Sequence, residues 1–295
     1  MGKRLTIFGS IVLSLGLGAG AQGGPSSPGD AEVKEVGRTT EREVNVVLSS
    51  GFGSIQISKG EPEKILTLDS PTGKDETGRI NVDYAVRNRV GYAEISLDGE
   101  SREGDHGKKW LQLDGFKGDK CFLRFSDAIP ISFDIELGVG KARIDLTGLQ
   151  VKDFTLSAGA TDVEVSFDQP NKATIENMSI EAGVSKFTGH NLGNANFKSF
   201  KFEGGVGAYI LDFSGKMDTE VDADVEIGVG TLTIVVPKEV GAKVMYEKTW
   251  ISHLECDSDF AEVSENQYTS TNYATATGRM NIKVQSAMGS VKIQR

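Results

Sequence analysis

Residues 133–146 read FDIELGVGKARIDL, and residues 225–236 repeat the design as VEIGVGTLTIVV. On each side of the Gly-Val-Gly segment, apolar and polar residues alternate, which is the pattern of a half-buried β-strand. Glycine has no Cβ and can adopt a positive φ, so we expect the chain to bend sharply between two strands at this point. The side chains between or beside the glycines are then expected to point inward at the corner, namely those of Val139, Val184, Val206 and Val229.

The unit recurs at nearly even spacing through much of the chain. The glycines assigned to corners are Gly138, Gly140, Gly159, Gly183, Gly205, Gly207, Gly228 and Gly230. Irregular copies occur at Phe52-Gly53, Val90-Gly91 and Met288-Gly289. A repeat of about 22 residues is the size of one coil of a single-stranded β-solenoid, either a β-helix or a β-roll. One coil cannot bury enough apolar surface to order its own backbone, so the coils are expected to stack, with less regular segments capping the ends.

The N-terminal segment, residues 1–21, has the three parts of a secretory signal peptide. Lys3 and Arg4 form a charged region, residues 5–17 form an apolar region, and residues 19–21 form a small-residue cleavage site. The apolar run is shorter than the roughly 20 residues that a membrane-spanning helix needs. We therefore expect export to the periplasm, the outer cell surface or the extracellular space, with no transmembrane span in the mature chain.

Changes in composition divide the remainder of the chain. Residues 22–43 are rich in Gly, Ser and Pro and then charged, which is typical of a flexible leader. The repeats are clearest in residues 131–245, which we assign to the solenoid. Residues 44–130 are expected to form an N-terminal β region that caps it, and residues 246–295 a C-terminal β cap.

The formal net charge of the chain is −10. Lys3 and Arg4 contribute +2 to the signal segment, which contains no acid, so the remainder carries −12. Such acidity argues against nucleic acid and against an anionic membrane surface as partners.

Two cysteines, Cys121 and Cys256, flank the repeat region. In an oxidising compartment they allow one disulfide, but two cysteines cannot by themselves show that they lie close together, so separate thiols are equally compatible. The three histidines, at positions 106, 190 and 253, have no ligand spacing to either sulfur. We therefore assign no metal site and expect no cofactor.

Carboxylates alternate along several predicted strands, as in Asp134 with Glu136, Asp162 with Glu164, and the series Glu220, Asp222, Asp224 and Glu226. Stacked coils would bring some of them about 5 Å apart. Such rows could bind calcium or hold a general acid and base, or they could form a charged surface that keeps a solenoid soluble. We favour the soluble surface, because the glycine-aspartate nonapeptide of calcium-binding rolls is absent.

Catalytic signatures are missing from the sequence. The Gly-x-Gly segments precede strand-like alternation and not the helix that a phosphate-binding loop requires. No Gly-x-Ser-x-Gly elbow occurs, and the histidines show no local pairing with an acid, so no catalytic residue is assigned. Aromatic residues outside the regular coils could mark a sugar-binding face or pack within the caps, namely Trp110, Trp250, Tyr246, Tyr268 and Tyr273.

The run from Ile129 to Gly140, the segments Asp145-Leu-Thr-Gly-Leu149 and Leu211-Asp-Phe-Ser-Gly215, and residues 228–237 together resemble the toast-rack and LiaF-like group of bacterial envelope proteins, which is related to the putative adhesin domains. The resemblance is good over about residues 120–245. It implies a β-helix or β-roll at the cell surface or membrane, and its LiaF-like branch implies sensing of envelope stress. This chain departs from that branch because the several transmembrane helices that precede the LiaF-like domain are missing.

The sequence thus predicts a non-enzymatic, exported β-solenoid that acts as a binding or structural surface in adhesion or the envelope-stress response. An envelope protein or a glycan is the kind of partner to expect, and nucleic acid is not. A polysaccharide-acting β-helix enzyme and a calcium-stabilised surface protein are the alternatives, and both rest on the acidic strand faces.

Overall fold

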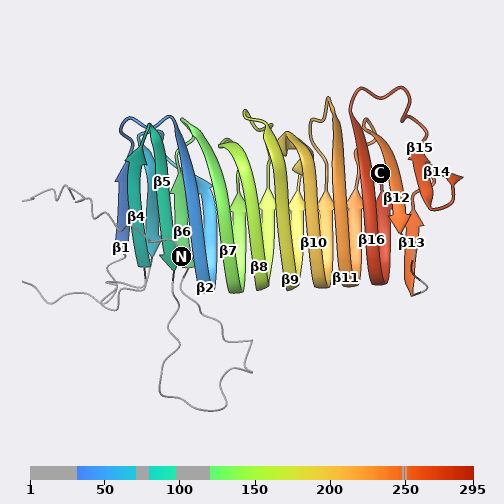
Figure 1. Ribbon diagram of the computed structural model, residues 1–295, viewed down its shortest axis with the longest axis horizontal. Coiled ribbons are helices and arrows are strands. Elements are labelled where there is room, and N and C mark those ends of the chain that lie inside the picture. The colour runs from blue at the N-terminus through green and yellow to red at the C-terminus, as the bar shows by residue number, and fades with distance from the viewer. Residues whose placement is uncertain (1–31, 71–79, 98–119, 248, 250) are drawn as a thin grey trace, which may run out of the picture.

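The structure is a computed structural model that describes residues 32–70, 80–97, 120–247, 249 and 251–295 (Figure 1). The signal peptide expected at residues 1–21 lies outside the described residues. The described part is almost entirely β, and its strands join into one large, mostly parallel sheet. The all-β class predicted from the sequence is confirmed.

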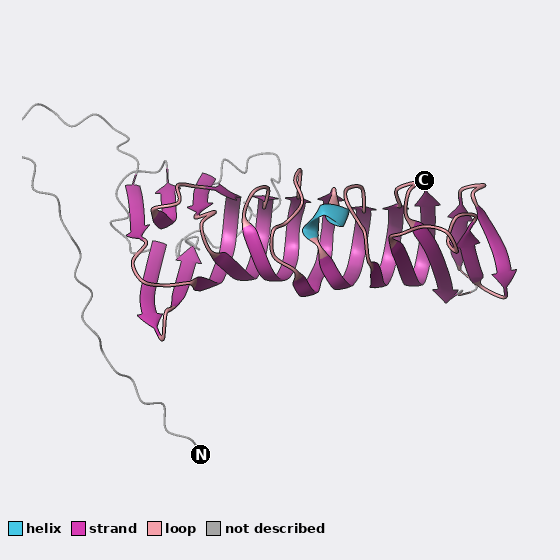
Figure 2. Ribbon diagram, turned by 90° about the horizontal axis from the view of Figure 1, so that it is seen from above, coloured by secondary structure: helices cyan, strands magenta, loops and turns pink. Residues whose placement is uncertain are grey.

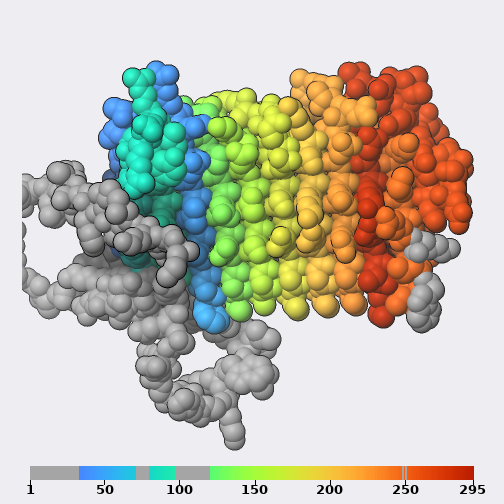
Figure 3. All heavy atoms as spheres, viewed as in Figure 1, coloured from blue at the N-terminus to red at the C-terminus, as the bar shows by residue number. Residues whose placement is uncertain are grey.

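Seven long strands form the central part of the sheet. They pair in parallel in the order β2 (Glu43–Lys59), β7 (Pro130–Asp145), β8 (Gln150–Ser166), β9 (Ile175–His190), β10 (Phe197–Asp212), β11 (Glu220–Val235) and β16 (Arg279–Gln294). Each spans 16 or 17 residues. The strands stand side by side, with most of their connections along one edge of the row (Figure 1). In the space-filling view they form adjacent upright bands from blue to red, so successive strands share one continuous face (Figure 3).

Each long strand has two arms that meet at a bend near its middle, so that the row of strands forms a bent stack (Figure 2). Along both arms, buried and exposed residues alternate, as the burial of Phe133, Ile135 and Leu137 and then of Ala142 and Ile144 shows for β7. The inward side chains of the two arms therefore face a common core. The register keeps like positions in line: Leu137 pairs with Ala158, Ala158 with Ala182, Ala182 with Gly204, and Gly204 with Ile227.

At the N-terminal end, the strand next to β2 is split at the corner. Strand β5 (Val90–Leu97) pairs with residues 43–50 of β2, and β6 (Lys120–Phe125) pairs with residues 54–59. Antiparallel strands complete this end, namely β4 (Ile80–Arg87) on β5, β3 (Lys64–Ser70) on β6, and β1 (Glu32–Gly37) on β3. The flexible leader expected at residues 22–43 is therefore wrong for residues 32–37, which form a six-residue strand because β3 supplies a partner for their backbone.

The C-terminal end repeats this arrangement. Strands β12 (Gly241–Glu247) and β13 (Ser252–Cys256) pair with the first and second arms of β16, and the antiparallel strands β15 (Gln267–Ser270) and β14 (Phe260–Ser264) follow on β12. Strand β16 is thus inserted between β11 and β12, although it comes after β12 to β15 in the chain. The cap expected at residues 246–295 therefore contains a full-length strand of the central stack.

The core is packed with aliphatic and aromatic side chains from both arms. Phe197, Phe200 and Phe213 form one aromatic group, in which the rings of Phe200 and Phe213 lie edge to face with centroids 5.2 Å apart. The 3-10 helix η2 (Leu192–Ala195) is also buried, and the amide of its Gly193 donates to the carbonyl oxygen of Ser214, the residue after Phe213, at 3.1 Å (Figure 2, cyan). Among the described residues, no helix is long and apolar enough to cross a membrane.

Candidate functional site

The leading glycines of the repeat lie in one column across the stack. A Cβ on Gly138 would come within 2.3 Å of the carbonyl oxygen of Gly51, and a Cβ on Gly183 within 2.6 Å of that of Gly159. Gly205 and Gly228 face the glycine of the preceding strand in the same way, both at 2.5 Å, and Gly159 faces it at 3.0 Å. Neighbouring backbones at this corner therefore approach more closely than a side chain would allow.

A second glycine column follows two residues later. Gly53, Gly140, Gly230 and Gly289 have φ values of 132°, 150°, 142° and 131°. A Cβ on Gly140 would lie 1.9 Å from the Gly53 carbonyl oxygen, and Gly207 would meet that of Ser185 at the same distance. The positive φ expected at the corners thus occurs in the second column, whereas the glycines of the first column are required only for close approach.

The residues beside and between these columns point outward. Phe52 is 49% exposed, Val184 66%, Val206 48%, Val229 40% and Met288 47%. The inward orientation expected for Val184, Val206 and Val229 is therefore wrong, and Val139 is only partly buried. The reason is that the alternation changes phase at the corner. Residues that point inward along one arm differ by an even number in the sequence, whereas the buried residues on the two sides of a corner, such as Leu137 and Ala142, differ by an odd number.

The register lines these outward side chains up in one row. Phe52 pairs with Val139, Val139 with Ala160, Val184 with Val206, Val206 with Val229, and Val229 with Met288. Between β8 and β9, the pairs Ala158–Ala182 and Val163–Phe187 on either side of the corner place Ala160 opposite Val184. We call this row the corner ridge; it consists of Phe52, Val139, Ala160, Val184, Val206, Val229 and Met288. At about 4.8 Å per strand, the ridge is roughly 29 Å long.

A shallow trough runs beside the corner ridge. Its volume is about 480 Å³, its floor is made by the backbone of Gly159, Gly183, Gly205 and Gly228, and its wall carries Glu181, Glu203 and Glu226. These three glutamates occupy the same position in consecutive strands. Lys201 forms an ion pair with Glu203 at 2.5 Å, while Glu181 and Glu226 have no ion-pair partner within the described part of the chain.

The alternating carboxylates Glu220, Asp222, Asp224 and Glu226 lie exposed on the outer face of β11. Asn281 donates hydrogen bonds to Glu220 and Asp222 at 2.9 and 3.1 Å. Asp224 lies in register between Lys201 and Lys283. The series is thus interleaved with amide and ammonium groups, which disperses its negative charge.

Across the described ranges, no group of three or more His, Cys, Asp or Glu side chains is placed to hold a metal ion. On the second arms of β7 and β8, Glu164 pairs with Arg143 at 3.0 Å. A groove of about 890 Å³ lies over these arms, over those of β2 and β9 and over the start of β6. Its charged lining is Lys120, Lys141, Arg143, Asp162, Glu164 and Lys186. Its mixed charges resemble those of a solvated strand face.

The two cysteines lie at opposite ends of the sheet. Cys121 is in β6 and Cys256 is in β13, and eight strand spacings separate these strands in the sheet order. At about 4.8 Å per spacing, the Cα atoms of the two cysteines are far beyond the roughly 7 Å that a disulfide allows between them. A bridge between them within one chain, which the cysteine count had allowed, is therefore excluded. Burial raises the pKa of the Cys256 thiol to about 11, so it stays protonated at neutral pH.

The aromatic residues considered for a binding face do not form one in the described part of the chain. Trp110 and Trp250 lie outside the described residues. Tyr246 is buried, and Tyr268 and Tyr273 are half-buried. The Tyr273 hydroxyl donates to Asn281 at 2.8 Å, which assigns it to cap packing.

The chain matches the family model described as "N-terminal domain of toast_rack, DUF2154" over residues 25–190 and again over residues 171–235. The chain belongs to the toast-rack family. The first match alone spans more than half of the chain. The resemblance of the repeat segments to the toast-rack family is therefore confirmed, and the stacked, bent strands are the form that the toast-rack sequence takes here.

The solved structures that match this toast-rack chain share little sequence with it. A putative cell adhesion protein from Clostridium sporogenes is 20% identical, with a TM-score of 0.46, over 90% of this chain and 99% of that one. A putative adhesin from Bacteroides fragilis is 14% identical, with a TM-score of 0.39, over 90% and 97% of the two chains. A putative lipid binding protein from Parabacteroides distasonis is 7% identical, with a TM-score of 0.30, over 89% and 96%. No protein with a curated description matches the chain.

Proposed function

We propose that this toast-rack chain is an exported, non-enzymatic protein of the bacterial cell envelope or surface, in which the stacked strands serve as a binding surface for adhesion or the sensing of envelope stress. The observation that carries the proposal is the corner ridge. Single exposed apolar residues are ordinary on protein surfaces, but contiguous apolar patches commonly mark interaction sites. The ridge crosses seven consecutive strands, and five of its positions carry a large exposed apolar side chain, four of them on the adjacent strands β9, β10, β11 and β16.

The same proposal includes the solenoid. From β7 to β11, positions that pair in adjacent strands are one repeat apart in the sequence, as Ala142 with Val163 and Val163 with Phe187 show. This supports coils of the predicted size. We propose that β2 and β16 are the first and last full coils. The split strands and the antiparallel strands beyond them then act as caps, because they cover edges that would otherwise pair with other chains.

Export is supported by the charged, apolar and small-residue regions of residues 1–21. Export can be tested by expressing the protein in a bacterium, recovering it from the envelope or the medium, and measuring its intact mass. We expect the N-terminus to follow Ala21. Recovery of only the full-length chain from the cytoplasm would contradict export.

The binding function can be tested with the mature protein immobilised and exposed to solubilised bacterial envelope. We expect a defined glycan or protein to be retained by the wild type and lost from a variant with Val184→Ser, Val206→Ser and Val229→Ser. A control with Val47→Ser, Met245→Ser and Val263→Ser removes exposed apolar side chains elsewhere and should retain it. Equal retention by all three proteins would count against the ridge as the binding surface.

A further inference from the structure

The corner ridge is narrow. It is one side chain wide and roughly 29 Å long, and it runs between the row that contains Glu181, Glu203 and Glu226 and a second row on the other side. A stable interface between two folded proteins usually buries about 800 Å² on each partner. A single row of this length supplies only a part of that area, so its shape favours a thin, linear partner over a second copy of this chain.

The charges beside the ridge are unequal. The row on the trough side carries Glu136, Ser157, Glu181, Glu203, Glu226 and Gln285 in register. The row on the opposite side carries Ser54, Lys141, Asp162, Lys186, Ala208, Thr231 and Ser290. From β10 to β16 that second row has no charge.

Positive charge near the ridge comes from Lys141, Lys186, Lys201 and Lys283, and Lys283 forms an ion pair with Glu247 at 3.1 Å. Lys141 and Lys186 lie on the opposite row, on β7 and β9, and Lys201 is paired with Glu203. Neither Glu181 nor Glu226 forms an ion pair within the described part of the chain, and their carboxylates line the wall of the trough. A positively charged group placed in the trough would meet these carboxylates while its apolar neighbours covered the ridge.

We propose that the corner ridge and its trough bind an extended polypeptide segment that carries apolar and basic side chains, laid along the stack across β8 to β11. This inference rests on the proposed binding function and names the chemistry of its partner. The trough can hold such a segment because Gly159, Gly183, Gly205 and Gly228 present no side chains on its floor. Binding an anionic membrane is disfavoured, because the glutamate row would repel it.

The test uses the mature full-length protein and two fluorescein-labelled peptides, one of alternating leucine and lysine and one in which glutamate replaces lysine. Fluorescence anisotropy should show saturable binding of the Leu-Lys peptide and at least about tenfold weaker binding of the Leu-Glu peptide. The Val184→Ser, Val206→Ser, Val229→Ser variant and a Glu181→Gln, Glu203→Gln, Glu226→Gln variant should each lose at least about tenfold in affinity.

Matched controls separate these effects from unfolding and from general charge. A Glu63→Gln, Glu239→Gln, Glu265→Gln variant removes the same number of exposed acids outside the trough and should bind as the wild type does. All variants should keep the wild-type melting temperature, since the substituted side chains are exposed. An affinity unchanged by the trough substitutions, or equal affinity for both peptides, would overturn the inference while leaving the ridge as a binding surface.

Two further outcomes would also overturn it. Concentration-dependent dimerisation in light scattering that the ridge substitutions abolish would assign the ridge to a second copy of the chain. Sedimentation with vesicles of neutral and anionic lipids, abolished by the same substitutions, would assign it to a membrane. If neither the peptides nor an envelope component bound the ridge, the proposed function itself would fail.

Discussion

At the scale of single residues, the first glycine column sets how closely the strands approach at the corner. Gly138→Ala places a Cβ 2.3 Å from the Gly51 carbonyl oxygen, a backbone atom that cannot move without shifting β2. Overpacking of this kind costs about 1–3 kcal/mol, so we expect a clear loss of unfolding free energy in urea. Gly51→Ala is the matched control, because its Cβ would meet no atom within 4 Å. If both variants lost the same unfolding free energy, the first glycine column would not be required for the close approach of the strands.

A buried carboxylate gives a prediction about pH. Glu41 is 5% exposed and accepts hydrogen bonds from the Thr39 amide and hydroxyl at 2.9 and 2.7 Å. Burial alone would raise its pKa, but the hydrogen bonds from Thr39, with smaller contributions from the backbone of Glu41 itself and from Tyr84, together outweigh burial and hold the pKa below its ordinary value near 4.5. The stabilisation is therefore complete above pH 4.5 and is lost as the pH falls through the lower pKa of the folded state.

We accordingly expect Glu41→Gln to lower the unfolding free energy by about 1 kcal/mol at pH 7 and by less in acid. Urea unfolding of both proteins between neutral and acidic pH measures the difference. If the difference in unfolding free energy between the wild type and Glu41→Gln stayed constant or grew as the pH falls, the stabilising role of the ionised Glu41 would be contradicted.

Much of the corner could be predicted from the sequence, because glycines in regular spacing have few other uses. The outward direction of Val184, Val206 and Val229 could not. Period-two alternation fixes the inward face of each arm, but the phase between the arms depends on the bend itself. A comparison of the apolar residues in the two arms would have shown the change of phase, because Ile227 and Leu232 are both buried and their residue numbers differ by an odd number.

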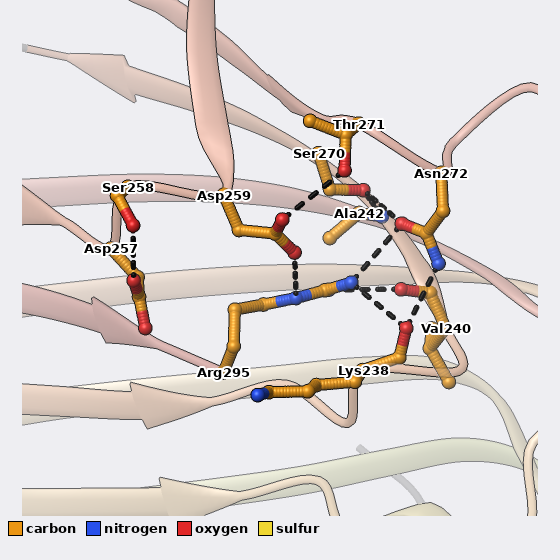
Figure 4. Close-up of polar contacts among 10 residues, drawn as sticks. All are labelled: Lys238, Val240, Ala242, Asp257, Ser258, Asp259, Ser270, Thr271, Asn272 and Arg295. Carbon is orange, nitrogen blue, oxygen red and sulfur yellow. Dashed lines mark hydrogen bonds and ion pairs between the residues drawn. The ribbon is translucent and has the colours of Figure 1, made fainter.

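At the scale of elements, the insertion of β16 between β11 and β12 is stabilised by Arg295. This side chain is 1% exposed, and its Nε donates to Asp259 at 2.9 Å. Its other nitrogens donate to the carbonyl oxygens of Val240 and Lys238 and to the side chain of Asn272, so one guanidinium joins β16 to three segments of the C-terminal end (Figure 4).

Because Arg295→Ala removes a side chain that is 1% exposed together with its four hydrogen bonds, it should cost about 2–3 kcal/mol of unfolding free energy. Arg295→Lys should recover only part of this, since a single ammonium cannot reproduce the planar set of donors. Arg143→Ala, which breaks an ion pair with both side chains about half exposed or more, is the control and should cost less than about 1 kcal/mol. A cost for Arg295→Ala no larger than the control would show that β16 is held by its strand pairing alone.

The order of β16 could not be predicted from the sequence. The copy at Met288-Gly289 indicated a corner there, but strand pairing is decided by contacts between distant segments, and the pattern of one strand does not specify its neighbour. The strand at residues 32–37 was missed for a similar reason, since its short alternation is stabilised by β3.

At the scale of the whole molecule, the surface charge gives no sign of calcium dependence. Carboxylates on β11 alternate in register with Asn281 and Lys283 of β16, and none of the described residues form a cluster for a metal. We therefore expect the melting temperature to be the same with added calcium and with chelator, measured by circular dichroism. A rise with calcium that chelator reverses would favour the calcium-stabilised alternative.

The central claim is that the corner side chains of successive strands form one continuous outward row. Oxidative crosslinking tests it most directly, with Cys121→Ser and Cys256→Ser as the background and cysteines placed in pairs on the ridge. Val206→Cys with Val229→Cys joins neighbours in register, at about the strand spacing of 4.8 Å, and should form an intramolecular disulfide readily. Val184→Cys with Val229→Cys spans two spacings and should form none. Failure of the first pair, or equal crosslinking of both, would contradict the aligned ridge.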